Sequence, residues 1–185
     1  MTELPDGIRL RPEQDSDVAE VDALHRTAFG PGGDVVAGLL PELRVIASTS
    51  LVAEADGRVV GHVACSPSWL DAPRRLVVVQ VLSPLAVLPG HQGRGVGAAL
   101  VDAARQAVVE LGSPALFLEG DPGYYARLGF RAGGELGFRR PSLRIPEPAF
   151  QVVLLPAHEP WMTGTLVYPE LFWRHDAVGL RDPGA

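Results

Sequence analysis

Apolar and polar positions follow two different periods along this chain, and together they predict a mixture of strands and helices. Alternation over residues 8–11 predicts an edge strand, and apolar residues at helical spacing over 14–29 predict a helix. Gly30-Pro31-Gly32-Gly33 breaks that helix, and a second helix is predicted over 34–43. The predicted N-caps are Asp15 or Ser16 for the first helix and Asp34 for the second.

Two apolar runs, 51–55 and 59–66, predict adjacent antiparallel strands, because Asp56-Gly57-Arg58 between them is typical of a hairpin turn. The next strand is predicted over 76–82 and 85–88, interrupted at Ser83-Pro84. Proline cannot donate a hydrogen bond to a ladder, so we expect pairing to fail there on at least one side and the sheet to bulge or splay.

The second half of the chain continues the pattern. One apolar stripe over 96–111 predicts an amphipathic helix that covers the sheet and ends at Gly112. The remaining predicted elements are a buried strand at 115–118, a short helix at 124–128 with Asp121 as its cap, and a late strand at 151–155. The predicted fold class is α/β, with a mixed, mostly antiparallel, splayed central sheet and helices on both faces.

Length and composition bound the class of protein. The 185 residues, 46% hydrophobic and 21% charged, fit one soluble domain over 1–185, with a core at about 7–155 and a C-terminal extension over 156–185 packed on it. A net charge of −6 argues against nucleic acid as a partner. Polar N-terminal residues, short apolar runs and a single cysteine, Cys65, predict a cytoplasmic protein without a membrane partner.

The most informative stretch is residues 84–98, where an apolar strand enters a glycine-rich turn and then an alanine-rich helix. Such a turn predicts an anion site, because glycines allow close approach and the N–H groups of the first helical turn point outward. The chain has no lysine, which excludes a Gly-Lys-Ser/Thr phosphate loop. A dinucleotide-binding fingerprint remains open, with Gly93, Gly95 and Ala98, followed by Glu119.

The same turn resembles the Gln/Arg-x-x-Gly-x-Gly/Ala motif of the GCN5-related N-acetyltransferases (GNAT), matched here by Gln92, Gly95 and Gly97. Their Tyr-x-x-x-Gly-Phe signature is matched from Tyr125 to Phe130. The Gly-Asp-Pro sequence and the paired tyrosines resemble a bacterial subgroup of predicted N-acetyltransferases. That similarity extends to Pro148-Ala149-Phe150 and Tyr168-Pro169.

The resemblance implies acetyl-CoA as cosubstrate and an amine of a small molecule or peptide as acceptor, and it is compatible with a homodimer. Backbone N–H groups of the turn would hold the pyrophosphate, and Tyr125 would protonate the departing thiolate. The predicted coenzyme-binding residues are Leu85, Ala86 and Val87 for the pantetheine arm, and Gln92, Gly93, Arg94, Gly95, Val96, Gly97 and Ala98 for the pyrophosphate.

The general base is less clear from the sequence. Many relatives carry a glutamate on the strand before the glycine turn, where this chain offers only Gln80 and Ser83 as polar side chains. Glu119 is the leading substitute, and the alternatives, acting through water, are His25, His62 and His91. The five histidines show no ligand spacing, so we predict no metal.

Two other functions remain open at this point. The missing strand glutamate is compatible with an inactive coenzyme-binding sensor or interaction module. The dinucleotide fingerprint is compatible with an NAD(P)-dependent oxidoreductase, which would require a parallel sheet with the glycine turn after its first strand.

Overall fold

The computed structural model describes residues 6–179, which fold into two compact units. The first unit comprises the described residues up to Ser66 together with Leu82–Val108, and the second comprises Pro67–Val81 and the described residues from Val109 onward. Strands β3 (Arg58–Asp71) and β4 (Leu76–Val87) contribute residues to both units.

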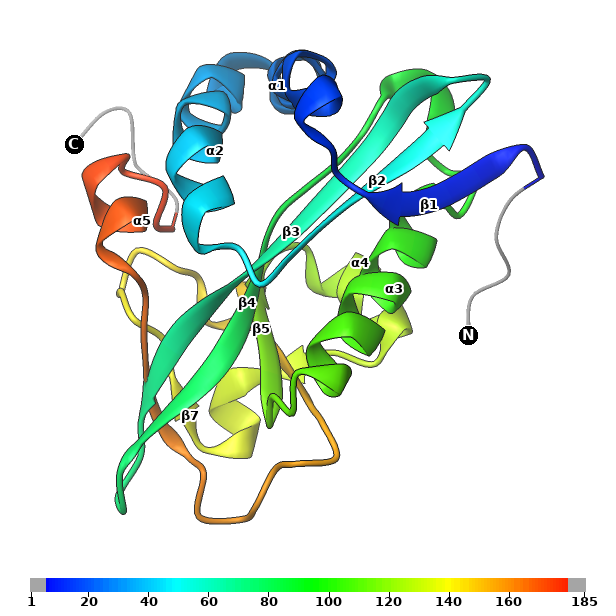
Figure 1. The fold of residues 1–185 in the computed structure, drawn as a ribbon. Coiled ribbons are helices and arrows are strands. Elements are labelled where there is room, and N and C mark those ends of the chain that lie inside the picture. Colours follow the sequence, from blue (N-terminus) through cyan, green and yellow to red (C-terminus); the bar gives the residue numbers. More distant parts are fainter. Residues whose placement is uncertain (1–5, 180–185) are drawn as a thin grey trace. The chain divides into compact units, whose positions relative to one another are not determined.

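The strands form a mixed, mostly antiparallel sheet (Figure 1). The other strands are β1 (Ile8–Pro12), β2 (Thr49–Ala55), β5 (Ala115–Glu119), β6 (Arg131–Ala132), β7 (Phe138–Arg139), β8 (Phe150–Leu154) and β9 (Gly164–Val167). The helices are α1 (Val18–Phe29), α2 (Gly33–Ile46), α3 (Val96–Glu110), α4 (Pro122–Tyr125) and α5 (Glu170–Arg174). The hydrogen-bonded order is β1-β2-β3-β4-β5-β8-β6, with β9 pairing β3 and β7. Only the pairs β4–β5 and β7–β9 are parallel among those whose register is described. The predicted fold class is confirmed.

The first unit places helices on both faces of its strands, as predicted (Figure 1). The β2–β3 hairpin turns at Asp56 and Gly57, which have φ of 49° and 75°, as a two-residue primed turn requires. Neighbouring residues of β3 then face opposite sides. At Gly61 an added Cβ would meet Leu100 and Val96 of α3, whereas His62 contacts His25 of α1.

The predicted helix starts were wrong by a few residues. A 3-10 turn over Asp15–Asp17 precedes α1, and Asp17 is the N-cap residue in place of Asp15 or Ser16. The Asp17 carboxylate accepts from the backbone N–H of Gln14, 2.8 Å away, and also pairs with Arg11. Asp34 lies inside the first turn of α2, since that helix already begins at Gly33.

Strand β4 runs continuously through Pro84, so the predicted interruption was wrong. Its described register with β5 comprises Gln80–Leu116 and Val81–Phe117 and therefore ends before the proline. A missing N–H removes a donor on one side of a strand only. Because β4 also pairs with β3, its residues from Leu82 to Val87 continue as a strand in the first unit.

The second unit is built on β5 and β8, with a cluster of aromatic rings as its core. Phe117 stacks on Phe150 with ring centroids 5.7 Å apart, and it meets Phe138 edge-to-face at 5.0 Å. The segment after residue 155 supplies β9, which pairs antiparallel with β3 from Trp69–Val167 to Asp71–Thr165. The subdivision into a core at about 7–155 and an extension stays a prediction.

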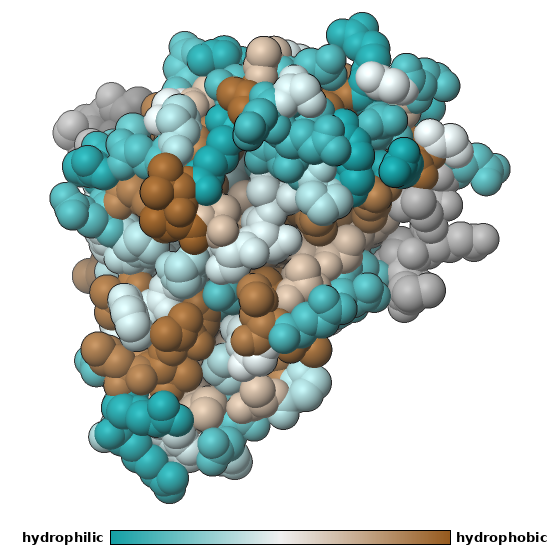
Figure 2. Space-filling model, viewed as in Figure 1, coloured by the Kyte–Doolittle hydropathy of each residue, from teal (hydrophilic) through white to brown (hydrophobic). Residues whose placement is uncertain are grey.

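Large apolar side chains are exposed on one face of the strands in the second unit (Figure 2). Trp69 and its partner Val167 are 48% and 42% exposed, and Leu76 and Val78 of β4 are also exposed. No helix within residues 6–179 is long and apolar enough to cross a membrane. Over the same described residues, no three His, Cys, Asp or Glu side chains gather as metal ligands would.

Candidate functional site

The glycine-rich turn lies in the first unit, between the end of β4 and the start of α3. Gly93 has a φ of 72° and Gly95 a φ of 88°, which is backbone that residues with a Cβ rarely adopt. An added Cβ at Gly93 would meet no atom within 4 Å. The turn therefore needs glycine for its backbone shape, and there is open space beside it.

Helix α3 presents at this turn the N–H donors of its first turn, which have no partner within the helix. Its hydrogen-bond ladder begins where the Ala99 N–H donates to the Gly95 carbonyl, 2.9 Å away. The N–H groups of Val96, Gly97 and Ala98 precede that bond and are free of the ladder. The first turn carries no acidic residue, so the positive end of a helix of 15 residues is uncompensated. These groups fit a phosphate-bearing ligand.

The polar side chains around the turn have different roles. The Gln92 side chain donates to the Val87 carbonyl at 2.9 Å and so ties the turn to the end of β4. Arg94 is exposed. The Nδ1 atom of His91 is buried and has no hydrogen-bond partner among the described residues. Such an orphaned atom in the segment that leads into the turn adds to the fit of a polar ligand.

Tyr125 lies in the second unit, at the end of α4. The side chain of Asp121 accepts from the Gly123 N–H at 2.9 Å, which confirms the predicted cap of this short helix. The Tyr125 ring covers Gly120 so closely that a Cβ at Gly120 would collide with it. It also meets Phe130 edge-to-face at 5.7 Å. The ring is therefore held in place at its edges.

The Tyr125 hydroxyl has no hydrogen-bond partner among the residues that the structure describes. Burial raises the pKa of Tyr125 above its ordinary value. The group is therefore fully protonated at neutral pH and can donate its proton. Tyr124 packs edge-to-face on Tyr125 at 4.9 Å and lies under the Arg127 guanidinium, 5.8 Å from its ring centroid.

Both carboxylate oxygens of Glu119, at the end of β5, are engaged. One accepts from the Tyr168 hydroxyl at 2.8 Å and the other from the Gly179 N–H at 3.0 Å. Burial raises the pKa of Glu119, and these two hydrogen bonds offset only part of that effect. Glu119 thus ties the C-terminal segment to β5, a role that the sequence did not predict because the partners lie 49 and 60 residues away.

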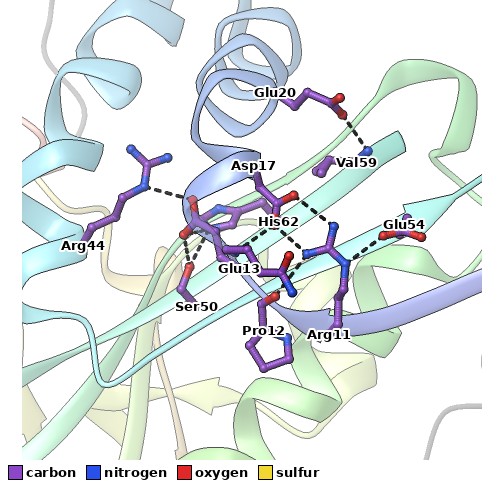
Figure 3. Close-up of polar contacts among 11 residues, drawn as sticks. Arg11, Pro12, Glu13, Asp17, Glu20, Arg44, Ser50, Glu54, Val59 and His62 are labelled. Carbon is purple, nitrogen blue, oxygen red and sulfur yellow. Dashed lines mark hydrogen bonds and ion pairs between the residues drawn. The ribbon is translucent and has the colours of Figure 1, made fainter. Parts of the chain in front are cut away.

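A buried chain of polar groups crosses the first unit (Figure 3). Ser50 donates to Glu13, and the Ser50 oxygen therefore accepts from His62 Nε2–H, 2.9 Å away. In a neutral His62 ring, Nδ1 is then a lone pair that accepts from His25 Nε2–H at 2.8 Å. Arg44 of α2 binds the other Glu13 oxygen at 2.9 Å and Asp22 of α1 at 2.9 Å. No sequence pattern pointed to Glu13 or Ser50.

These hydrogen bonds argue against two of the histidines that were considered as general bases, His62 and His25. Both ring nitrogens of His62 are used inside the chain. His25 is fully buried, its Nδ1 has no hydrogen-bond partner among the described residues, and mainly burial lowers its pKa to about 3. A group with that pKa is a weak proton acceptor at neutral pH. The geometry therefore favours a structural role, in which the chain joins α1 and α2 to β2 and β3.

Comparison with known proteins agrees with the topology. Residues 47–132 match the family model of the acetyltransferase (GNAT) domain. The uncharacterized N-acetyltransferase YjhQ of Escherichia coli (strain K12) is 32% identical over 135 residues, which cover 71% of this chain and 74% of YjhQ.

Two solved structures extend the similarity over most of the chain. The GNAT family N-acetyltransferase YhbS of Escherichia coli, in complex with CoA, is 32% identical with a TM-score of 0.82, and the match covers 94% of this chain and 96% of that one. A GNAT family acetyltransferase of Brucella melitensis in complex with acetyl-CoA is 29% identical with a TM-score of 0.72, covering 89% and 97%. The chain therefore belongs to the GNAT family of N-acetyltransferases.

Proposed function

We propose that this acyltransferase moves an acetyl or another short acyl group from acetyl-CoA to a primary amine of a small molecule or peptide. The observation that carries the proposal is the row of free N–H groups at the start of α3, behind a turn that needs glycine at two positions. The two solved relatives above bind CoA or acetyl-CoA, which supports the same ligand here.

In this proposal the backbone from Gln92 to Ala98 holds the pyrophosphate, and the backbone of Leu85, Ala86 and Val87 pairs with the pantetheine arm as an added strand would. The short register of β4 with β5 supports the second part, because it leaves the later part of β4 without β5 as a partner. The coenzyme supplies an activated acyl group as a thioester.

The chemistry is a direct attack. The amine nitrogen forms a bond to the thioester carbonyl carbon, the carbon–sulfur bond breaks, and the thiolate leaves. Tyr125 donates its proton to the thiolate, which fits a protonated hydroxyl without a partner in the described protein. A thiol has an ordinary pKa of about 8.5 and a phenol about 10, so this transfer is uphill even before burial raises the tyrosine pKa.

The amine must also lose a proton. We keep Glu119 as the proposed acceptor of that proton, since its raised pKa brings it closer to neutral than an ordinary carboxylate. Its bonds to Tyr168 and Gly179 support a structural role as well. The variant Tyr168→Phe separates the two roles. If Glu119 is the base, Glu119→Gln removes the acidic limb of the pH–rate profile. Tyr168→Phe then keeps that limb but shifts the pH at which it occurs.

The oxidoreductase alternative does not agree with the sheet. A dinucleotide-binding fold needs a parallel sheet with the glycine turn after its first strand. Here β1 to β4 precede the turn, and the sheet is mostly antiparallel.

Calorimetric titration with acetyl-CoA tests the coenzyme site, using two matched variants. Gly93 and Gly112 have φ of 72° and 73°, and an added Cβ would meet nothing within 4 Å at either position. Gly93→Leu and Gly112→Leu therefore carry similar backbone strain, but only the first obstructs the turn. We expect Gly93→Leu to weaken acetyl-CoA binding at least about tenfold, and Gly112→Leu to bind like the wild type.

Equal binding by the wild type and Gly93→Leu would contradict this placement of the coenzyme. Absence of acetyl-CoA binding by the folded wild type would overturn the proposal itself. Binding without turnover across a panel of primary amines would favour the inactive coenzyme-binding module.

A further inference from the structure

An open pocket of about 350 Å³ lies entirely within the second unit, apart from every residue assigned above to the coenzyme or to acyl transfer. Ligand pockets typically start at about 300 Å³, so its size fits a small molecule. Its walls come from the 3-10 turn before β7, from β7, the following loop, β8 and β9. The lining residues are Gly134, Phe138, Arg139, Arg140, Leu143, Glu147, Phe150 and Thr165.

The floor of the pocket is apolar and rigid. Phe138 and Phe150 are buried, and both pack against Phe117 in the aromatic core. Gly133 allows this arrangement, because a Cβ there would collide with the Phe150 ring. Leu143 extends the apolar lining at the mouth, where its side chain is 87% exposed. An apolar ligand body would bury the exposed part of this lining.

Two adjacent arginines supply the polar side of the pocket. The Arg139 Nε–H donates to the Thr165 hydroxyl at 2.9 Å, which leaves its two terminal nitrogens without a partner among the described residues. The Nε of Arg140 is buried and also has no partner there. Leaving a buried charged donor unpaired costs free energy, and an acceptor oxygen from a ligand would remove that cost.

A carboxylate already lies close to the Arg140 guanidinium. Glu147 lies 3.6 Å from the Nη1 of Arg140, which is ion-pair distance but too long for a hydrogen bond. Glu147 is 71% exposed, so the pair is weak and is readily displaced. With two arginines against one glutamate, the pocket attracts an anion and repels a cation.

We propose that this pocket binds a small organic carboxylate with an apolar body. The carboxylate would pair with the guanidinium groups of Arg139 and Arg140 in the planar geometry that arginine favours, and the apolar body would lie on Phe138, Phe150 and Leu143. This binding does not depend on the proposed acyl transfer, because no coenzyme or acceptor residue takes part in it.

Titration of the full chain with 4-phenylbutyrate at low ionic strength tests the proposal, with the uncharged 4-phenylbutyramide as a matched ligand. We expect saturable binding of the carboxylate with a Kd of about 1 mM or tighter, and at least about tenfold weaker binding of the amide. Absence of saturation by the carboxylate, or equal affinity for both compounds, would overturn the proposal.

Three variants locate the binding. Arg140→Gln should weaken carboxylate binding at least about tenfold, and Glu147→Gln should strengthen it because a competing carboxylate is removed. The control is Arg131→Gln, which removes an exposed arginine paired with Glu135 at a similar 3.5 Å in the same unit but outside the pocket.

Thermal unfolding of each variant shows whether it is folded, and Glu147→Gln keeps the test valid if Arg140→Gln is not. Wild-type affinity in a folded Arg140→Gln, or weaker binding by Glu147→Gln, would contradict the assigned site. Weaker binding by Arg131→Gln to the same degree as by Arg140→Gln would do so too.

Discussion

At the scale of single residues, the two tyrosines of α4 show how the same side chain takes different environments. The Tyr125 ring is fixed by Gly120 and Phe130, while Tyr124 lies between Tyr125 and Arg127. Burial raises the pKa of both hydroxyls. The motif register, together with this packing, favours Tyr125 as the proton donor.

Tyr125→Phe removes the hydroxyl and keeps the ring packing. We expect kcat to fall about 10- to 100-fold with little change in acetyl-CoA binding, because general acid catalysis acts on the chemical step. Steady-state kinetics with calorimetry measure both quantities. Tyr124→Phe is the control and should keep kcat close to the wild type. Equal losses in the two variants would assign the effect to packing of α4 in general.

At the scale of elements, one glycine allows a helix to lie close to the sheet. A Cβ at Gly61 of β3 would approach Leu100 to 2.9 Å and both Ala53 and Val96 to 3.3 Å. Val96 is the first residue of α3 and is buried. The contact at Gly61 therefore positions the end of the helix whose free N–H groups form the proposed pyrophosphate site.

Gly61→Val should push α3 away from β3. We expect a loss of about 1–3 kcal/mol in the free energy of unfolding, as for overpacked cores, together with weaker acetyl-CoA binding. Denaturant unfolding and calorimetry measure the two effects. Gly32→Val is a matched control in the same unit, because a Cβ at Gly32 meets nothing within 4 Å. Unchanged coenzyme binding in a folded Gly61→Val would show that the helix start is positioned by other contacts.

At the scale of the whole molecule, the buried chain through Glu13 links the stability of the first unit to pH. Burial alone would raise the pKa of Glu13, but the nearby His62 ring, 3.5 Å from the carboxylate, the hydrogen bond from Ser50 and the charge of Arg44 outweigh it and lower the pKa to about 2. The unfolded chain has the ordinary value of 4.5. The stabilisation is therefore complete above pH 4.5 and is lost as the pH falls from 4.5 toward about 2.

Glu13→Gln tests this linkage. At pH 7 we expect the variant to be about 3 kcal/mol less stable than the wild type, with the gap closing as the pH falls toward about 2. Chemical unfolding across this pH range measures the gap. Asp34→Asn removes a carboxylate that is 92% exposed and should cost little at any pH. A gap for Glu13→Gln that stays constant with pH would contradict the linkage.

The sequence predicted those elements whose signals are local. The β2–β3 hairpin, the cap at Asp121 and the helix after the glycine turn depend on neighbouring residues only, and all three are present in the structure. The strands β6, β7 and β9 were missed, because two to four residues carry too little periodicity. Sequence reasoning also ended β3 at Ser66, whereas its pairing with β9 extends it to Asp71.

By itself the sequence determined the fold class and the family, because the hydrophobic periods and the two glycine-containing motifs involve residues that are close together along the chain. The tertiary structure alone decided which polar side chains meet. Glu13, Ser50, His62 and His25 join across four segments, and Glu119 meets Tyr168 and Gly179. A hydrogen bond forms only between atoms about 3 Å apart in space, and the spacing of residues along the chain does not tell which atoms come that close.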